Sequence, residues 1–296
     1  MRSQLLDNQG NKLNLHRYDR RRKYKNFFML ALFTGLTLLA VLPFVSILGY
    51  VISRGYSALS LDLFTNLPKP VGETGGGIAN ALVGSISMVL MASLVGIPMG
   101  TLAGAYLSEF GHGKVATALR FTCDLLVSVP SIIIGLFAYT IIVVPMKGFS
   151  AYAGAAALLM IQVPMVTRTT EEILKLVPQH LREAGLALGI PRWKVILRIV
   201  LRGSVSGLTT GVMLAVARIM GETAPLIFTA FNNRYWSESL GQPTASLPVL
   251  IYTYAISPYE DWHAQAWAAA LVLVCFVLLL NISTRLIIGR RPEGRH

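Results

Sequence analysis

Six long apolar segments constrain this chain more than any other feature. Each approaches or exceeds the ~20 residues that a helix needs to cross the hydrocarbon core of a bilayer. The predicted spans are residues 27–52, 78–107, 125–145, 151–167, 206–231 and 265–288. Only 14% of the 296 residues are charged, against roughly 25% in soluble domains. This excludes an ordinary soluble enzyme, a disordered regulator and a disulfide scaffold, and predicts an all-α membrane protein with six transmembrane helices.

The positive charges predict how these spans are oriented. The formal net charge is +12, and Lys and Arg residues collect in the cytoplasmic loops of membrane proteins. With the N-terminus inside, 20 of the 26 Lys and Arg residues fall on the cytoplasmic side, and only Arg54, Lys69, Lys147 and Arg234 fall outside. Both termini are therefore expected in the cytoplasm, and the charge needs no nucleic-acid partner to explain it.

The chain carries no pattern typical of a catalytic, metal or cofactor site. Cys123 and Cys275 are isolated, and no two of the five histidines have ligand spacing. The nearest approach to a nucleotide-binding P-loop is Gly111-His-Gly-Lys114, which lacks both the first glycine and the Ser or Thr after the lysine. If the protein moves a solute with ATP, another subunit must supply the ATPase.

The segment from 171 to 205, between the predicted fourth and fifth spans, reads as two amphipathic helices with a break between them. Pro178 allows a helix to begin directly after it, and Gly189 with Pro191 ends that helix. The residues expected on the apolar sides are Leu181, Ala184 and Leu188 in the first helix and Trp193, Ile196, Leu197 and Val200 in the second. Such a pair could rest on lipid headgroups or dock a partner protein.

The spacing within this segment resembles the EAA loop of binding-protein-dependent ABC importer permeases. Glu183 and Ala184 are followed by Gly189, six residues after the glutamate, and two positions depart from the usual pattern, Gly185 for alanine and Arg202 for proline. In that family the loop forms the coupling helix that sits in a cleft of the ATPase. The resemblance therefore implies that Glu183, Ala184 and Gly189 couple this chain to an ATPase subunit.

The fifth predicted span carries two charged residues, Arg218 and Glu222, four residues apart. Arg218 lies about 18 Å into the span at 1.5 Å per residue, where an unpaired cation is costly. The small residues that precede the pair at four-residue spacing are Gly203, Gly207, Gly211 and Ala215. Small residues at this spacing allow close helix packing, so we expect the pair on a face directed at other helices. It is either a structural ion pair or a substrate-binding cation with its resting counterion.

Three runs resemble one family of permeases more narrowly. They are residues 73–81, residues 162–171 and residues 217–226, and they are similar to those of the PstA family, permease subunits of phosphate-specific ABC importers of the bacterial inner membrane. The resemblance implies the type I ABC importer permease fold, and a phosphate pathway with Arg168, Arg218 and Glu222. For Arg168, an anchor at the membrane surface is an equal alternative. The implied partners are a PstC-like permease, two PstB-like ATPase subunits and an external PstS-like phosphate-binding protein.

The expected organisation is a basic cytoplasmic tail (1–26), a permease domain (27–290) containing the coupling loop (171–205), and a cytoplasmic C-terminal end (291–296). A permease for another oxyanion, such as phosphonate, sulfate or molybdate, is the nearest alternative function. An ion-driven secondary carrier would show repeats or interrupted helices in matching halves. An intramembrane enzyme would need a nucleophile and a base facing each other at depth, and no predicted span contains a histidine.

Overall fold

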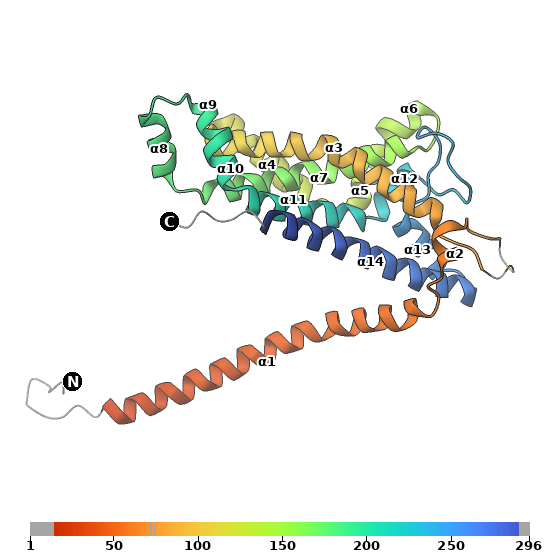
Figure 1. Ribbon diagram of the computed structural model, residues 1–296, viewed down its shortest axis with the longest axis horizontal. Helices are drawn as coiled ribbons and strands as arrows, with labels where there is room; N and C mark the ends of the chain where they lie inside the picture. Colours follow the sequence, from red (N-terminus) through yellow and green to blue (C-terminus); the bar gives the residue numbers. More distant parts are fainter. Residues whose placement is uncertain (1–14, 71–72, 74, 290–296) are drawn as a thin grey trace, which may run out of the picture. The chain divides into compact units, whose positions relative to one another are not determined.

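The computed structural model describes residues 15–70, 73 and 75–289, which form helices and connecting segments (Figure 1). The first 14 residues of the predicted basic tail and the predicted C-terminal end lie outside the described residues. The elements in chain order are α1 Leu15–Tyr56, α2 Leu61–Thr65, α3 Ala79–Glu109, α4 Lys114–Ser128, α5 Ser131–Ala138, the π-helix η1 Tyr139–Val143, α6 Val144–Met146, α7 Ala151–Lys175, α8 Gln179–Ala187, α9 Arg192–Val195, the π-helix η2 Ile196–Val200, α10 Leu201–Gly203, α11 Val205–Met220, α12 Ala224–Thr229, α13 Leu247–Ala255 and α14 Glu260–Gly289.

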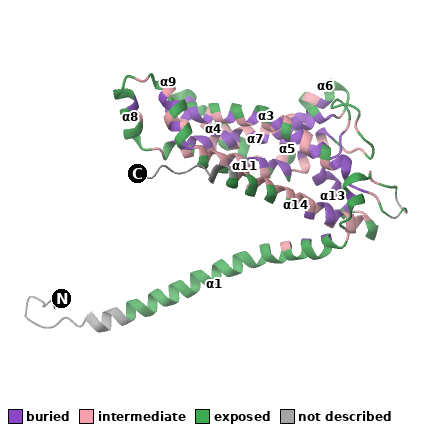
Figure 2. Ribbon diagram, viewed as in Figure 1, coloured by how far each residue is buried: buried purple, intermediate pink, exposed green. Residues whose placement is uncertain are grey.

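The chain divides into two compact units, residues 1–53 and residues 54–296. Helix α1 makes up the described part of the first unit. Its side chains from Arg21 to Tyr50 are exposed, apart from the half-buried Leu48, and they include large apolar groups such as Phe27 and Phe44 (Figure 2). A helix that is apolar all round is typical of a membrane span.

Three single helices are long and apolar enough to cross a membrane: α1 from Arg21 onward, α3 and α14. Two bent pairs meet the same condition together, α4 with α5–α6 and α9–α10 with α11. The predicted fourth span lies in α7, which is 25 residues long but carries several charged residues in its last two turns. These helices, with α7, account for the six predicted segments.

The third predicted span is not one continuous helix. Helix α4 ends at Ser128, a bend of 103° follows, and the next helix begins at Ser131. Val129 is extended because the ring of Pro130 disfavours a helical conformation in the residue before it. The prediction of a span from 125 to 145 was therefore wrong at its start, since residues 125–128 belong to α4.

The fifth predicted span is also interrupted. Helix α11 ends at Met220, and α12 begins at Ala224 with Pro225 in its first turn. Proline is well suited to a first helical turn, where its missing N–H costs nothing. Glu222 therefore lies in the break and not on the continuous helix that was predicted to run from 206 to 231.

Helix α7 is the central element of the second unit and packs against α3, α4, α5, α11 and α12. Its contact with α3 is close because Gly96, Gly100 and Gly104 line the interface; a Cβ atom at each would lie 2.5–2.7 Å from an atom of α7. The main core unites buried residues of α3, α7, α11 and α12. Because protein covers α7 on several sides, its polar C-terminal end does not need to face lipid.

A second core lies between α13 and α14, near the end of the bundle where α3 begins. Leu247, Leu250 and Tyr254 of α13 pack there with Leu63 of α2 and Ile78. Helix α13 was not predicted from the sequence. Its nine residues are too few to give the signal of a span.

Candidate functional site

The coupling segment forms a helix, a sharp turn and a second helical stretch (Figure 1). Gly189 ends α8 with a φ of +72°, a left-handed conformation that glycine adopts at helix C-termini without a steric cost. The backbone N–H groups of Gly189 and Ile190 donate to the carbonyl oxygens of Leu186 and Gly185, which closes the turn. Residues 171–175, counted in the predicted loop, are the last turn of α7.

One face of this segment is apolar and exposed. Leu181, Ala184 and Leu188 all face outward, as does Glu183, and Leu188 is 79% exposed. In the second stretch the prediction of one shared apolar side was partly wrong, because Trp193 and Leu197 are exposed while Ile196 and Val200 are buried, together with Val195. The π-helix η2 spans Ile196–Val200 and shifts the face that the helical period alone predicts. The exposed residues form a surface suited to a protein partner.

The departure from the family pattern at Gly185 has a structural explanation. Gly185 is buried, and a Cβ atom there would lie 2.9 Å from Cγ2 of Val195 and 3.0 Å from Cδ1 of Ile199. The two helical stretches therefore approach each other more closely than an alanine at this position allows without adjustment. This contact makes the coupling segment a compact unit.

A charged clamp attaches the coupling segment to the end of α3. Nε and Nη2 of Arg182 donate to the carboxylate of Glu109 at 2.7–3.1 Å, and Nη1 and Nη2 also donate to the carbonyl oxygens of Val177 and Leu174. Arg192 donates to the backbone oxygen of Glu109 at 2.6 Å. This clamp was not predicted from the sequence, because Glu109 and Arg182 were counted only as cytoplasmic charges. The signal that could have indicated the clamp is the position of Glu109, a carboxylate directly at the end of an apolar segment.

Arg168 belongs to a second cluster of charges, built around Glu171 on α7. The side chain of Glu171 is 0% exposed and accepts from Arg120 at 2.6 Å, Lys175 at 2.6 Å and Arg168 at 2.8 Å. Arg168 also pairs with Asp124 of α4 at 2.8 Å. The cluster joins α4 to α7 before the bend that Pro130 sets, and it holds the Arg168 guanidinium between carboxylates.

Arg218 and Glu222 are brought together as predicted, although the helix between them ends. Nε of Arg218 lies 3.6 Å from Oε1 of Glu222, and the two side chains are 47% and 14% exposed. The two charged groups are therefore only loosely paired, and the Arg218 side chain is half-exposed. Glu222 is the one carboxylate that pairs with Arg218 among the residues that the structure describes.

The small residues of α11 and Arg218 have different surroundings. Cβ atoms at Gly207 and Gly211 would meet Ile173 and Thr169 of α7, and Ala215 is buried, whereas Arg218 is exposed. Within this chain Arg218 is exposed, so the expectation that the pair lies on a face directed at other helices stays a prediction. We call the exposed face of α11 the open face of α11; it is formed by Ser206, Thr210, Leu214 and Arg218, of which all but Leu214 are polar or charged.

Sequence comparisons place the chain among known transport proteins. Residues 96–291 match the family described as binding-protein-dependent transport system inner membrane component. The phosphate transport system permease protein PstA of Yersinia pestis is 47% identical over 92% of each chain. The protein of the same name from Haemophilus influenzae is 48% identical over 90% of this chain and 94% of its own, and that from Xylella fastidiosa (strain 9a5c) is 49% identical over 81% and 84%.

Solved structures agree on the fold. A chain from the crystal structure of a bacterial alginate ABC transporter has a TM-score of 0.65 at 15% identity, over 94% of this chain and 98% of its own. A chain of the inward-facing MetNI methionine ABC transporter has a TM-score of 0.55 at 18% identity, over 72% and 93%. The predicted all-α, type I ABC permease fold and the resemblance to the PstA family are confirmed. The chain therefore belongs to the family of binding-protein-dependent transport system inner membrane components, and within it groups with the PstA permeases.

Proposed function

We propose that this chain is a permease subunit of an ATP-driven importer of inorganic phosphate in the bacterial inner membrane. The names of its relatives at 47–49% identity support the substrate. The observation that carries the proposal is the half-exposed Arg218 on the open face of α11, whose Nε lies 3.6 Å from Oε1 of Glu222. The protein passes phosphate inward by alternating access and catalyses no covalent step.

Arg218 is suited to bind an oxyanion. A planar guanidinium matches the oxygens of phosphate with paired, charge-assisted hydrogen bonds. At 3.6 Å the contact with Glu222 is longer than a good hydrogen bond, so that an anion displaces it at little cost. Glu222 acts as the counterion when no phosphate is bound, because it lies in the break between α11 and α12, where the chain can move without unwinding a helix.

The partners follow from the surfaces that the chain leaves exposed. A PstC-like permease covers the open face of α11, so that phosphate passes between the two subunits. The coupling segment, through Glu183, Ala184 and Gly189, docks one of two PstB-like ATPase subunits on the cytoplasmic side, where both termini also lie. A PstS-like protein delivers phosphate from outside. This chain has no ATPase site of its own.

Arg168 has a more indirect role in this proposal. Its guanidinium is held by Glu171 and Asp124, so that phosphate contacts it on the exit side only when these carboxylates release it. Its position next to the bend between α4 and α5 also supports the anchoring alternative. Arg218 is therefore the residue on which the pathway depends.

Uptake of radiolabelled phosphate by proteoliposomes that contain the whole complex tests the proposal. Arg218→Gln is expected to abolish ATP-driven uptake with assembly intact, and Lys114→Gln, an exposed cation far along the chain, serves as the control. Unchanged uptake in Arg218→Gln would contradict the pathway. Stimulation of ATP hydrolysis by sulfate, molybdate or a phosphonate with its binding protein, and not by phosphate, would contradict the substrate.

A further inference from the structure

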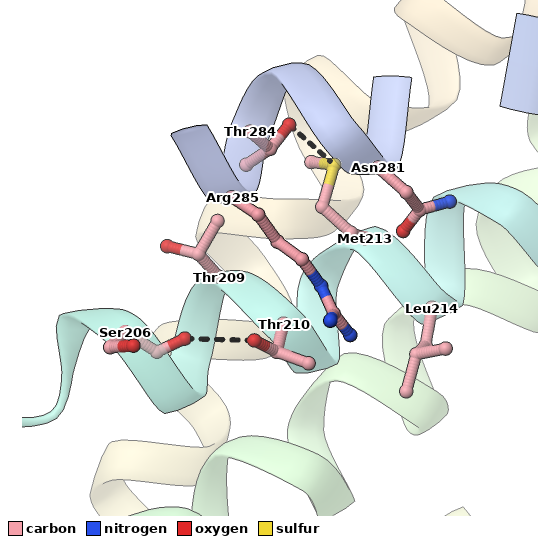
Figure 3. Close-up of a pocket in the computed structure, with 8 residues that line it drawn as sticks. All are labelled: Ser206, Thr209, Thr210, Met213, Leu214, Asn281, Thr284 and Arg285. Carbon is pink, nitrogen blue, oxygen red and sulfur yellow. Dashed lines mark hydrogen bonds between the residues drawn. The ribbon is translucent and has the colours of Figure 1, made fainter. Parts of the chain in front are cut away.

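A pocket between α11 and α14 carries a second cation that the pathway described above does not use. Its volume is about 100 Å³. The residues lining it are Ser206, Thr209, Thr210, Met213 and Leu214 of α11 and Asn281, Thr284 and Arg285 of α14 (Figure 3). Because one water needs ~10–15 Å³ of such space, a tetrahedral anion with four oxygens fits.

The pocket is electrostatically one-sided. Arg285 is the charged member of its lining, which contains no carboxylate. Within the part of the chain that the structure describes, no ion pair or hydrogen bond engages the Arg285 guanidinium. Figure 3 shows this side chain reaching from α14 across α11, with the guanidinium on the side of Thr210 and Leu214. Its five N–H groups are thus available to a ligand.

The other polar groups of the pocket are hydroxyls and one amide. The hydroxyls of Thr209, Thr210 and Thr284 donate to carbonyl oxygens of their own helices at 2.7–3.0 Å, and Asn281 uses one amide hydrogen in the same way. Threonine hydroxyls can rotate, and the second amide hydrogen of Asn281 is not used by that bond. These groups can therefore donate neutral hydrogen bonds to an anion whose charge the Arg285 guanidinium balances.

The pocket also continues the open face of α11. Leu214 lies one helical turn from Thr210 and one turn from Arg218, so that Thr210, beside which the Arg285 guanidinium lies in Figure 3, is about 12 Å from Arg218 along the axis of α11. Since the coupling segment leads directly into α11, Arg285 lies toward the coupling end of the bundle.

We propose that Arg285, with Thr210, Ser206 and Asn281, forms a second binding site for a phosphate group, next after Arg218 on the way to the coupling end. As a station for transported phosphate, the site rests on the proposed function. The same chemistry also suits the headgroup of an anionic phospholipid, since a long cation near a helix end reaches toward the membrane surface. The continuity with Arg218 favours free phosphate as the ligand.

The test uses the assembled complex and two probes. Binding of radiolabelled inorganic phosphate is measured in nanodiscs of phosphatidylcholine alone, and retention of phosphatidylglycerol is measured by native mass spectrometry of the detergent-solubilised complex. Arg285→Gln is expected to weaken phosphate binding at this site about tenfold, as loss of a charge-assisted hydrogen bond does. Thr210→Val, which keeps the shape of the side chain, is expected to weaken it less, and Lys114→Gln not at all.

The outcomes separate the two sources of the phosphate group. Weaker phosphate binding in phosphatidylcholine supports the transport station, and loss of retained phosphatidylglycerol alone supports a lipid headgroup site. If Arg285→Gln and Thr210→Val both match Lys114→Gln with both probes, the site is overturned. If Arg218→Gln loses uptake while Arg285→Gln keeps normal uptake and normal phosphate binding, this inference alone is overturned. If Arg218→Gln keeps normal uptake, the proposed pathway is contradicted, and the phosphate-binding result for Arg285→Gln still stands.

Discussion

Arg182 in α8 grips Glu109 at the end of α3 through two nitrogens, although 73 residues separate them in the chain. The Glu109 side chain is almost fully buried, so the pair is a rigid connection and not a loose surface contact. The pair connects the coupling segment to α3, which packs along α7, so we expect a movement of the segment to reach α3 through it.

Replacing Glu109 by Gln is expected to uncouple ATP hydrolysis from transport. The amide keeps the size of the side chain but leaves Arg182 with a weaker partner, at a cost of about 1–3 kcal/mol. We expect at least about a fivefold fall in phosphate taken up per ATP hydrolysed, the factor that about 1 kcal/mol produces. The ratio is measured in proteoliposomes. Glu238→Gln, at an exposed carboxylate, is the control, and an equal ratio in both variants would rule out the clamp as a coupling element.

Glu171 is expected to stabilise the bundle more than any exposed carboxylate. Glu171→Ala would leave Arg120, Arg168 and Lys175 without their shared buried partner. Removing one partner of a buried pair costs about 3–5 kcal/mol, and the partial exposure of the three cations places this case at the lower end. Thermal unfolding of the solubilised complex should show a clear loss for Glu171→Ala.

The neighbouring Glu172, 69% exposed and 4.0 Å from Arg168, supplies the matched control for this experiment. Glu172→Ala is expected to change stability by less than about 0.5 kcal/mol, as surface substitutions usually do. Equal unfolding temperatures for the two variants would show that the cluster around Glu171 contributes no particular stability.

Close packing of α3 on α7 predicts that Gly104 does not tolerate a side chain. A Cβ atom there would lie 2.5 Å from the backbone oxygen of Thr167 and 2.6 Å from Cβ of Thr170, and backbone atoms cannot turn aside. Gly104→Ala should cost about 1–3 kcal/mol through overpacking and lower the unfolding temperature. Gly203→Ala, where no atom lies within 4 Å, should leave that temperature unchanged or raise it; a fall of the same size in both variants would contradict the packing argument.

The exposed apolar face of the coupling segment predicts where an ATPase subunit binds. Leu188→Asp places a charge on a side chain that is 79% exposed, so that folding is preserved while burial in a partner's cleft becomes costly. We expect the ATPase to be lost from pull-downs of the tagged chain. Leu61→Asp, at an equally exposed leucine in α2, should retain it, and retention by both variants would place the docking surface elsewhere.

Much of this architecture could be read from local patterns. Apolar length located the spans, because the bilayer imposes the same requirement on every helix that crosses it. Gly189 marked the end of α8 because a left-handed residue is needed there. The pairing of Arg218 with Glu222 also followed from their spacing, even though α11 ends at Met220, between the two residues.

Side-chain environment could not be read in the same way. Glu109 and Glu171 look like ordinary loop carboxylates in the sequence, yet each is the buried partner of arginines from distant segments. The small-residue stripe of α11 predicted close helix packing, but only the tertiary structure shows that α7 covers Gly207 and Gly211 and leaves Arg218 exposed. The π-helix at 196–200 likewise changed which side of the second helical stretch is buried.

The sequence alone thus determined the class of the protein, the apolar segments and the motifs, since these depend on composition and on spacing along the chain. The tertiary structure decided where the charges meet: the clamp at Glu109, the cluster at Glu171, and the open face of α11 that carries Arg218 with the Arg285 pocket beside it. The reason is physical. The energy of a charge depends on which groups surround it in space, and those groups come from segments that the chain order does not place together.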